Sequence, residues 1–513
     1  MAAVVFALVG LVVLALLGAV HRYLWRRFVG DTTAPGSPLR RAGTVAAFVL
    51  PLLSIGAMTS GRVGAPFWLQ QVLAWPGFLW LACLLYLTLA LLVGEVVRPV
   101  LLRVLARRDG ATPGAGAPAV PEPATAGPAG ESGTATGTAT GTPADAPDGT
   151  RPRTEELVPS HSAASTRPEA AGRTATESVT EAVAGPVTGS VTKPATDPAT
   201  DPVAEPATEP GRERETEPAA GPLAGSATAP APATAPAPGP SRRLFVSRVV
   251  GGAAAAAGLA TVGYGTYGVL RGPSVRRITV PLAKLPRAAH GFRIAVVSDI
   301  HIGPILGRAH TRRIVDTINA TSPDLVAVVG DLVDGSVADL GSAAEPLSAL
   351  RARHGSFFVT GNHEYFSGAA QWVDHVRELG LHPLENARVE IEGFDLAGVN
   401  DIAGESEGQG PDFGRALGDR DRGRAAVLLA HQPVVIHDAV EHGVDLQLSG
   451  HTHGGQLWPG NFLAELANPT VAGLERYGDT QLFVSRGAGA WGPPVRVGAP
   501  SDITVVELAS RQA

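Results

Sequence analysis

Seven aspartate, asparagine and histidine residues in the second half of the chain have the types and spacing of metal ligands. Asp299 and His301 stand directly after the apolar run 292–297, and residues two apart in a strand point to the same side. Four further elements each follow a similar apolar run: Gly330-Asp331-Leu332-Val333-Asp334, Gly361-Asn362-His363-Glu364, His431, and Gly450-His451-Thr452-His453. The sequence therefore predicts that these side chains lie at strand ends or in the turns just after them.

Ligands of this kind and number suit two divalent metal ions. Hydrolysis of a phosphoester near neutral pH needs a nucleophile stronger than water and compensation of charge on the phosphoryl oxygens, and two metal ions about 3.5–4 Å apart provide both. Oxygen and nitrogen ligands suit manganese, iron or zinc, and the sequence does not choose among them. The predicted metal ligands are Asp299, His301, Asp331, Asn362, His431, His451 and His453.

Composition removes some classes of site. The chain has 513 residues and one cysteine, Cys83, which lies in an apolar segment, so disulfides and thiolate metal sites are excluded. The regions of the chain differ strongly in composition, so its net charge of −6 does not predict the kind of partner. We expect a phosphate-ester substrate and a membrane as partners, and no nucleic acid.

The ordered series D-x-H, G-D-x-x-D, G-N-H-E, a later histidine and G-H-T-H resembles the calcineurin-like metallophosphoesterase superfamily, over about residues 290–508. The resemblance implies that Asp331 bridges two metal ions. It implies that His363 binds no metal, faces the substrate, and donates a proton to the leaving oxygen or stabilises charge on the phosphate. The implied ligand sets are Asp299, His301 and His453 for one ion, and Asn362, His431 and His451 for the other.

Two longer stretches, GHTHGGQLWPG and SRGAGAWGPPVR, are similar to the membrane-associated, twin-arginine-exported bacterial branch of this superfamily. Asp334 and Glu364 belong to the motifs and are expected to orient ligands or cap turns. Asn400-Asp401 is not counted as part of the site.

The domain at 271–513 is expected to have an α/β fold, a layered metallophosphoesterase fold of two mixed β-sheets flanked by helices. Helical patterns lie at 310–320, 345–353 and 369–379. Strands are predicted at 292–297, 324–329, 356–360, 394–399, 425–429, 444–448, 481–485 and 503–508.

An α-helical multi-pass membrane region is expected at 1–108, with three transmembrane helices at about 2–20, 44–60 and 67–97. The alternative is a cleaved signal peptide followed by buried core helices. Arginines cluster between the first two apolar runs and after the third, so the positive-inside rule places the amino terminus outside and the end of the third helix in the cytoplasm.

Residues 109–240 are rich in Ala, Pro, Thr and Gly and are predicted to be a disordered linker. Residues 241–270 begin with Arg242-Arg243 before an Ala/Gly-rich apolar run, which indicates a twin-arginine signal or a fourth transmembrane helix. Both interpretations keep these arginines inside and place residues 271–513 on the extracytoplasmic side of the cell membrane.

The sequence favours a metal-dependent hydrolase of phosphomonoesters, phosphodiesters or lipid-linked diphosphates. A lipid-linked substrate suits a domain held near a bilayer. One alternative is a UDP-diacylglucosamine-type pyrophosphate hydrolase, whose substrate is expected on the cytoplasmic side. A protein phosphatase shares the metal motifs, but the domain shows no extra element for a polypeptide. A catalytically inactive sensor on the same fold would be expected to have lost ligands, and all of them are present.

Overall fold

The computed structural model describes residues 2–110 and 241–512. The run at 292–297 forms strand β2 (Phe292–Val297), which is buried on both faces because it lies inside a sheet covered on each side. This sheet has the order β1-β12-β2-β3-β4-β5. Its other strands are β1 (Ser274–Leu282), β12 (Asp502–Ser510), β3 (Leu325–Val329), β4 (Ser356–Val359) and β5 (His382–Pro383).

A second sheet faces the first and has the order β10-β11-β9-β8-β7-β6. Each sheet mixes parallel and antiparallel neighbours, with β2, β3 and β4 parallel in one and β7, β8, β9 and β11 parallel in the other. The predicted pair of mixed sheets is thus confirmed. The strands of the second sheet are β10 (Gly473–Tyr477), β11 (Thr480–Val484), β9 (Leu446–Ser449), β8 (Ala425–Leu429), β7 (Phe394–Gly398) and β6 (Ala387–Ile391).

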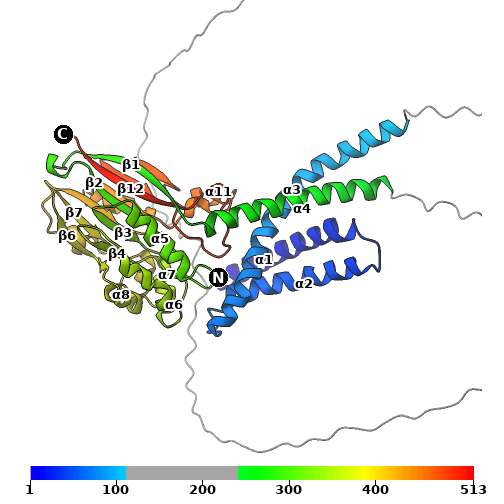
Figure 1. Ribbon diagram of the computed structural model, residues 1–513, viewed down its shortest axis with the longest axis horizontal. Coiled ribbons are helices and arrows are strands. Elements are labelled where there is room, and N and C mark those ends of the chain that lie inside the picture. Colours follow the sequence, from blue (N-terminus) through cyan, green and yellow to red (C-terminus); the bar gives the residue numbers. More distant parts are fainter. Residues whose placement is uncertain (1, 111–240, 513) are drawn as a thin grey trace, which may run out of the picture. The chain divides into compact units, whose positions relative to one another are not determined.

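Alternation along the strands builds the layers. In β2, Ile294 and Val296 point into the core between the sheets, whereas Ala295 and Val297 pack against helices on the other side. Helices α5 (Arg308–Ala320), α6 (Val337–Ala344) and α8 (Ala369–Glu378) cover that outer face (Figure 1). Helices α9 (Phe413–Leu417) and α10 (Ile436–Glu441) cover the outer face of the second sheet.

Four strands were not predicted, namely β1, β5, β6 and β10, and they are the four edge strands of the two sheets. An edge strand does not need a continuous apolar run, and β1 and β10 are largely exposed. The helix predicted at 345–353 is wrong in its extent. The chain there forms a short 3₁₀ turn, η3 (Glu345–Ala349), after α6, and the backbone becomes extended at Leu350.

Short elements complete the domain: α7 (Asn362–Ser367), α11 (Gly460–Ala467), and the 3₁₀ turns η2 (Arg287–Ala289), η4 (Ile402–Glu407), η5 (Pro433–Val435) and η6 (His453–Gly455). Helix α7 begins at the G-N-H-E motif, and η6 contains the last histidine of G-H-T-H.

In the part of the chain that the structure describes, four helices lie outside this domain: α1 (Ala2–Trp25), which continues into a π-helical turn η1 (Arg26–Gly30), α2 (Pro38–Thr59), α3 (Phe67–Gly110) and α4 (Arg242–Leu270). Among the described residues, three helices are long and apolar enough to cross a membrane: 38–59, 67–107 and 242–270. The predicted linker, 109–240, lies outside the described residues except for its first two, which end α3.

Helices α3 and α4 pack together in opposite directions. Gly258 of α4 lies against Leu87 of α3, so close that a Cβ on the glycine would be 2.8 Å from Leu87 Cδ2. Near the other end, Arg98 donates to Ser247 Oγ at 3.1 Å. Small residues at such an interface allow the two backbones to approach, which is typical of helices packed in membranes.

The last part of the domain contacts these helices directly. Val495 is buried with Ala82, Tyr86 and Val262, and the next residue, Arg496, donates its backbone N–H to the carbonyl of Gly265 at 3.3 Å. The hydroxyl of Tyr86 donates to the carbonyl of Trp458 at 2.9 Å. The apolar helices and the motif loops therefore contact each other directly.

Candidate metal centre

The predicted ligands gather at one edge of the two sheets because each follows the carboxyl end of a strand. The loop after β2 carries Asp299 and His301, the turn after β3 carries Asp331, and Asn362 begins α7 just after β4. From the second sheet, His431 follows β8 and His451 and His453 follow β9. Parallel neighbours end at the same edge, so residues far apart in sequence meet there.

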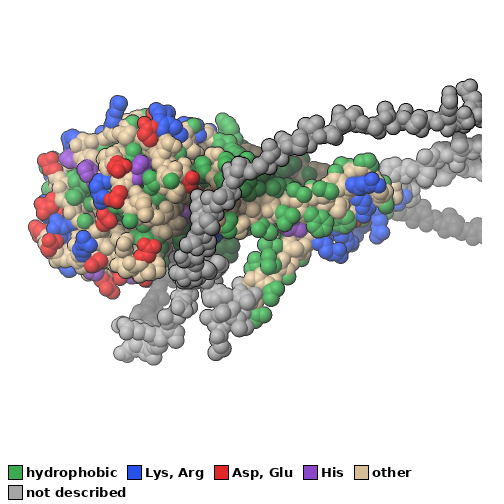
Figure 2. Space-filling model, turned by 90° about the horizontal axis from the view of Figure 1, so that it is seen from below, with side chains coloured by type: hydrophobic (Ala, Val, Ile, Leu, Met, Phe, Trp, Pro, Cys, Tyr) green, Lys and Arg blue, Asp and Glu red, His purple; other side chains and the backbone are tan. Residues whose placement is uncertain are grey.

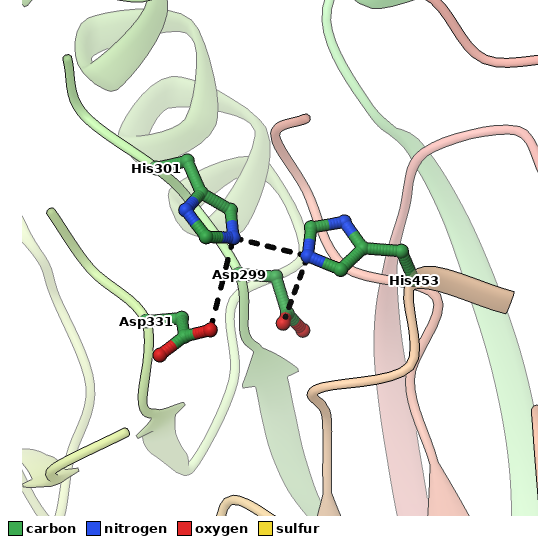
Figure 3. A group of neighbouring side chains, drawn as sticks. All are labelled: Asp299, His301, Asp331 and His453. Carbon is green, nitrogen blue, oxygen red and sulfur yellow. Dashed lines mark hydrogen bonds and ion pairs between the residues drawn. The ribbon is translucent and has the colours of Figure 1, made fainter. Parts of the chain in front are cut away.

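One group consists of Asp299, His301, Asp331 and His453, whose ligand atoms all lie within 4.8 Å of one another (Figure 3). The Nε2 atoms of His301 and His453 are 3.0 Å apart. Nε2 of His453 lies 3.4 Å from Oδ1 of Asp299, and Nε2 of His301 lies 3.8 Å from Oδ2 of Asp331. All four residues are buried.

A second group, Asp331, His431 and His451, meets the same 4.8 Å limit. Nε2 of His431 is 3.1 Å from Oδ2 of Asp331, and Nδ1 of His451 is 3.1 Å from Oδ1 of Asn362. Asp331 is therefore common to both groups, whereas Asn362 joins the second through His451.

The His431 ring shows that this pocket fits a cation. Its Nδ1 donates to the backbone carbonyl of Val329 at 2.9 Å, so the neutral ring presents an unprotonated Nε2 to the Asp331 carboxylate. Two acceptors that face each other at this distance need a proton or a cation between them. Burial lowers the pKa of His431, but the carboxylate of Asp331 outweighs burial and holds this pKa well above its usual value.

The two histidines of the G-H-T-H motif, His451 and His453, have the protonation state that a metal ion requires. Burial, with a smaller contribution from His431, lowers the pKa of His451 to about 4. Burial also holds the pKa of His453 well below its usual value. Both rings are thus neutral near pH 7, and a neutral imidazole is the species that binds a metal ion.

The backbone is strained where the candidate ligands lie. Five of the seven have positive φ angles, a region that residues other than glycine rarely adopt: Asp299 (51°), His301 (48°), Asp331 (51°), His451 (72°) and His453 (53°). Each such residue costs on the order of 1–3 kcal/mol, and strain of this kind gathers at functional sites. Gly330, before Asp331, also has a positive φ of 70°, and a Cβ there would lie 2.5 Å from Nδ1 of His431.

Glu364 holds two of the strained turns together. Its buried carboxylate accepts the backbone N–H groups of Asp331 (3.0 Å), Leu332 (2.8 Å) and Gly361 (2.6 Å). Burial and the neighbouring Asp331 raise the pKa of Glu364 to about 8, while the backbone donors act in the opposite direction. The carboxylate thus fixes the G-D and G-N turns relative to each other.

Asp334 connects a candidate ligand to His363. Its Oδ1 lies 2.8 Å from Nδ1 of His301 and 2.7 Å from Nδ1 of His363. Burial lowers the pKa of His363, but Asp331 and Asp334 outweigh it and raise this pKa to about 9. Burial raises the pKa of Asp334, but His301 and His363 outweigh burial and hold this pKa well below its usual range.

Sequence reasoning missed Arg496. This buried guanidinium donates to the backbone carbonyls of Gly489 (2.7 Å), His453 (3.1 Å) and Ala499 (3.0 Å), and its Nη2 lies 3.1 Å from Nδ1 of His453. Burial lowers its pKa to about 10. Arg496 ends the stretch SRGAGAWGPPVR, but its contact with His453 joins residues 43 apart in sequence, which the local pattern does not reveal.

The chain is similar to known proteins. The family model of the calcineurin-like phosphoesterases matches residues 292–455. A metallophosphoesterase of Helicobacter pylori strain J99 is 38% identical over 256 residues, which cover 49% of this chain and 68% of that protein. The chain belongs to the calcineurin-like metallophosphoesterases. Members of this family hydrolyse phosphoesters and use divalent metal ions, and the Asp/His groups described above are where this metallophosphoesterase can hold them.

Two further similarities are to a transmembrane relative and to a protein of known structure. A transmembrane protein with a metallophosphoesterase domain from Danio rerio is 38% identical over 259 residues, 48% of this chain and 59% of that protein, so this metallophosphoesterase spans only part of its length. A dimetal phosphatase from Danio rerio, of known structure, is 12% identical and covers 43% of this chain and 93% of its own, with a TM-score of 0.32. Together with the apolar helices, the transmembrane relative indicates a membrane protein.

Proposed function

We propose that this metallophosphoesterase is a membrane-tethered hydrolase that cleaves phosphoester bonds at a dinuclear metal centre. The observation that carries the proposal is the position of Asp331. Its Oδ2 lies 3.8 Å from Nε2 of His301 in one ligand group and 3.1 Å from Nε2 of His431 in the other. A single carboxylate shared by two groups of imidazoles is the arrangement that two neighbouring cations require.

The proposed ligands of one ion are Asp299, His301 and His453, those of the other are Asn362, His431 and His451, and Asp331 bridges them. When bound, a pair of divalent ions acidifies water and neutralises charge on the phosphoryl oxygens. The protein contributes ligands fixed in direction: Val329 orients His431, and Asp334 orients His301. Such partners behind a ligand hold its tautomer and its ring plane.

His363 is proposed to donate a proton to the leaving oxygen or to stabilise charge on the phosphate. Its ring lies edge-on to His301 at 4.7 Å between centroids, and its Nδ1 is held by Asp334. The other ring nitrogen, Nε2, is then left for the substrate. His301, Asp334 and His363 form a third group of close ligand-type atoms, but the His363 ring lies outside the two groups that share Asp331.

The tether is proposed to place the catalytic domain on the extracytoplasmic side. Arginines of different helices meet at one end of the bundle: Arg27 pairs with Glu95, Arg98 donates to Ser247, and Arg248 donates to the carbonyl of Thr32. Figure 2 shows Lys and Arg side chains gathered at that end of the helices. The chain leaves α4 at the opposite end, at Leu270, and positive charge favours the cytoplasmic end.

We also propose that residues 241–270 remain as a helix in the mature protein. Helix α4 contributes a buried face to α3 and to Val495, and these contacts would be lost if the helix were cleaved. The predicted twin-arginine character of Arg242-Arg243 stays a prediction about the route of export.

A turnover screen of the full-length protein in detergent tests the function. Phosphomonoesters, phosphodiesters and lipid diphosphates are assayed with manganese, iron or zinc. We expect turnover of at least one class and nearly complete loss of it in Asp331→Asn. The matched control is Asp316→Asn, an exposed carboxylate on α5 that lies outside both ligand groups. Turnover by Asp331→Asn at the rate of the control would contradict the proposal.

A further inference from the structure

We infer that an apolar rim beside the metal centre inserts into the membrane leaflet that α3 and α4 enter, and that the site takes phosphate esters carried on membrane lipids; this rests on the proposed function. Each rim side chain is between 50% and 84% exposed. Soluble surfaces rarely gather large apolar side chains in this way without a partner. The rim consists of Phe366, Trp458, Phe462, Leu463, Leu466 and Trp491.

Two rim residues stand directly at His363. The ring centroid of Phe366 lies 5.6 Å from that of His363, and the centroid of Trp491 lies 5.8 Å from it on an edge-to-face contact. Phe366 comes from α7, whereas Trp491 comes from the loop between β11 and β12. A ligand that reaches His363 between them therefore meets apolar side chains immediately next to the phosphate.

The rim is joined to the loop that carries the ligands. Gln456, three residues after His453, bonds through its side chain to the backbone N–H of Trp491 at 3.0 Å and to the carbonyl of Trp491 at 2.9 Å. The backbone N–H of Trp458 donates to Val497 at 2.9 Å. Trp458 and Trp491 are thus fixed relative to His453 by hydrogen bonds.

The rim lies at the depth of the membrane helices. Trp458 accepts the hydroxyl of Tyr86, near the middle of α3, and Val495 packs against Val262 of α4. Val262 lies about 12 Å before the end of α4, at 1.5 Å per residue. Tyr264 and Tyr267 follow it and are exposed, as aromatic residues are at the boundary between membrane and water.

Helix α11 has the pattern of a short interfacial helix. None of its residues is buried within the protein. Phe462, Leu463 and Leu466 share one face, and Asn461 and Glu465 lie next to each other on another. An apolar face beside a polar one suits a helix that lies in the plane of a membrane surface.

The occupant of the rim is therefore a lipid and not a second protein. The rim adjoins α3 and α4, because the Trp458 carbonyl accepts from Tyr86 and Val495 packs with Val262 in a buried contact. Acyl chains can rest on the rim while the phosphate of the same molecule reaches His363. A water-soluble phosphoester can be hydrolysed at the metal centre without contacting the rim. Its turnover therefore tests the proposed function separately from delivery of a lipid by the rim.

Insertion is tested without any measurement of activity. Because Cys83 is the single cysteine, a Cys83→Ala background allows one environment-sensitive dye to be placed at Leu463→Cys or, as a control, at the exposed Val440→Cys on α10, which covers the outer face of the second sheet. In full-length protein reconstituted into phosphatidylcholine–phosphatidylglycerol vesicles, the dye at 463 should shift to the blue and be quenched by nitroxide-labelled lipids. Equal exposure to water at 463 and 440 would overturn the inference.

Substrate delivery is tested by the triple variant Phe462→Ser, Leu463→Ser, Leu466→Ser, with Val440→Ser as the matched control. For a long-chain phospholipid substrate in vesicles we expect kcat/KM to fall by about tenfold or more, with unchanged turnover of bis(p-nitrophenyl) phosphate. An unchanged ratio between the two substrates would overturn delivery by the rim. If the rim does not insert but the soluble substrate is still hydrolysed, this inference is overturned and the proposed function is not. If Asp331→Asn still hydrolyses the soluble substrate, the proposed function is overturned.

Discussion

Replacing Asp334 by asparagine should slow turnover while leaving the ligands themselves in place. In the structure its Oδ1 lies 2.8 Å from Nδ1 of His301 and 2.7 Å from Nδ1 of His363. Asparagine keeps an acceptor oxygen and removes the charge. A hydrogen bond to a charged group contributes about 1.5–3 kcal/mol and a neutral one about 0.5–1.5 kcal/mol. Two bonds therefore lose about 2–3 kcal/mol together, which corresponds to a fall of about 30–150-fold in kcat/KM.

The assay compares kcat/KM and metal content of Asp334→Asn with those of Asp339→Asn, whose carboxylate accepts from the Ser336 hydroxyl at the start of α6. We expect the first variant to bind metal at saturating concentration and to turn over slowly, and the second to match the wild type. Equal turnover by both variants would refute the idea that Asp334 positions His301 and His363.

Three other predictions concern proton transfer, acid stability and topology. His363→Ala should keep its metal and lose about 10²–10⁴-fold in turnover, less for a substrate with a very good leaving group; loss of one metal equivalent would make His363 a ligand. His310 is buried, and burial lowers its pKa from 6.5 to about 4. Between pH 6.5 and about 4 the histidine is therefore protonated in the unfolded chain but neutral in the folded protein. The free energy of unfolding falls by about 3 kcal/mol as the pH drops through this range. His310→Leu should remove that loss from the pH dependence of the melting temperature, whereas the exposed His437→Leu should retain it; parallel curves would contradict the prediction. A reporter active only outside the membrane should be on when fused after Ala513 and off when fused at Pro210, and the reverse would place the site in the cytoplasm.

The sequence predicted the interior of the fold well because parallel strands covered on both faces read as continuous apolar runs. Strands β2 and β8 begin and end at their predicted residues, and the other predicted strands differ by no more than two residues at either end. The four edge strands carry no such signal. In β1, for example, Arg276 and Arg277 lie on an exposed edge, and only the neighbouring strand β12 makes the segment a strand.

The candidate ligands were predictable because each stands just after a buried strand, where side chains from parallel neighbours must meet. What connects them was less predictable. Arg496 donates to the carbonyl of His453, 43 residues earlier, and one oxygen of Asp334 lies within 2.8 Å of two histidines that are 62 residues apart in the chain. The contact of Trp458 with Tyr86 depends on the packing of α3 against the domain, which local pattern does not encode.

The proposed dinuclear centre is tested most directly by counting metal ions in the full-length protein and measuring turnover in the same samples. We expect two divalent ions per chain, complete loss of turnover after chelation, and recovery when manganese, iron or zinc is added back. In Asp331→Asn the bound metal should fall together with turnover, because one carboxylate is shared by both ligand groups. Full turnover in a sample shown to be free of metal would contradict the two-metal centre.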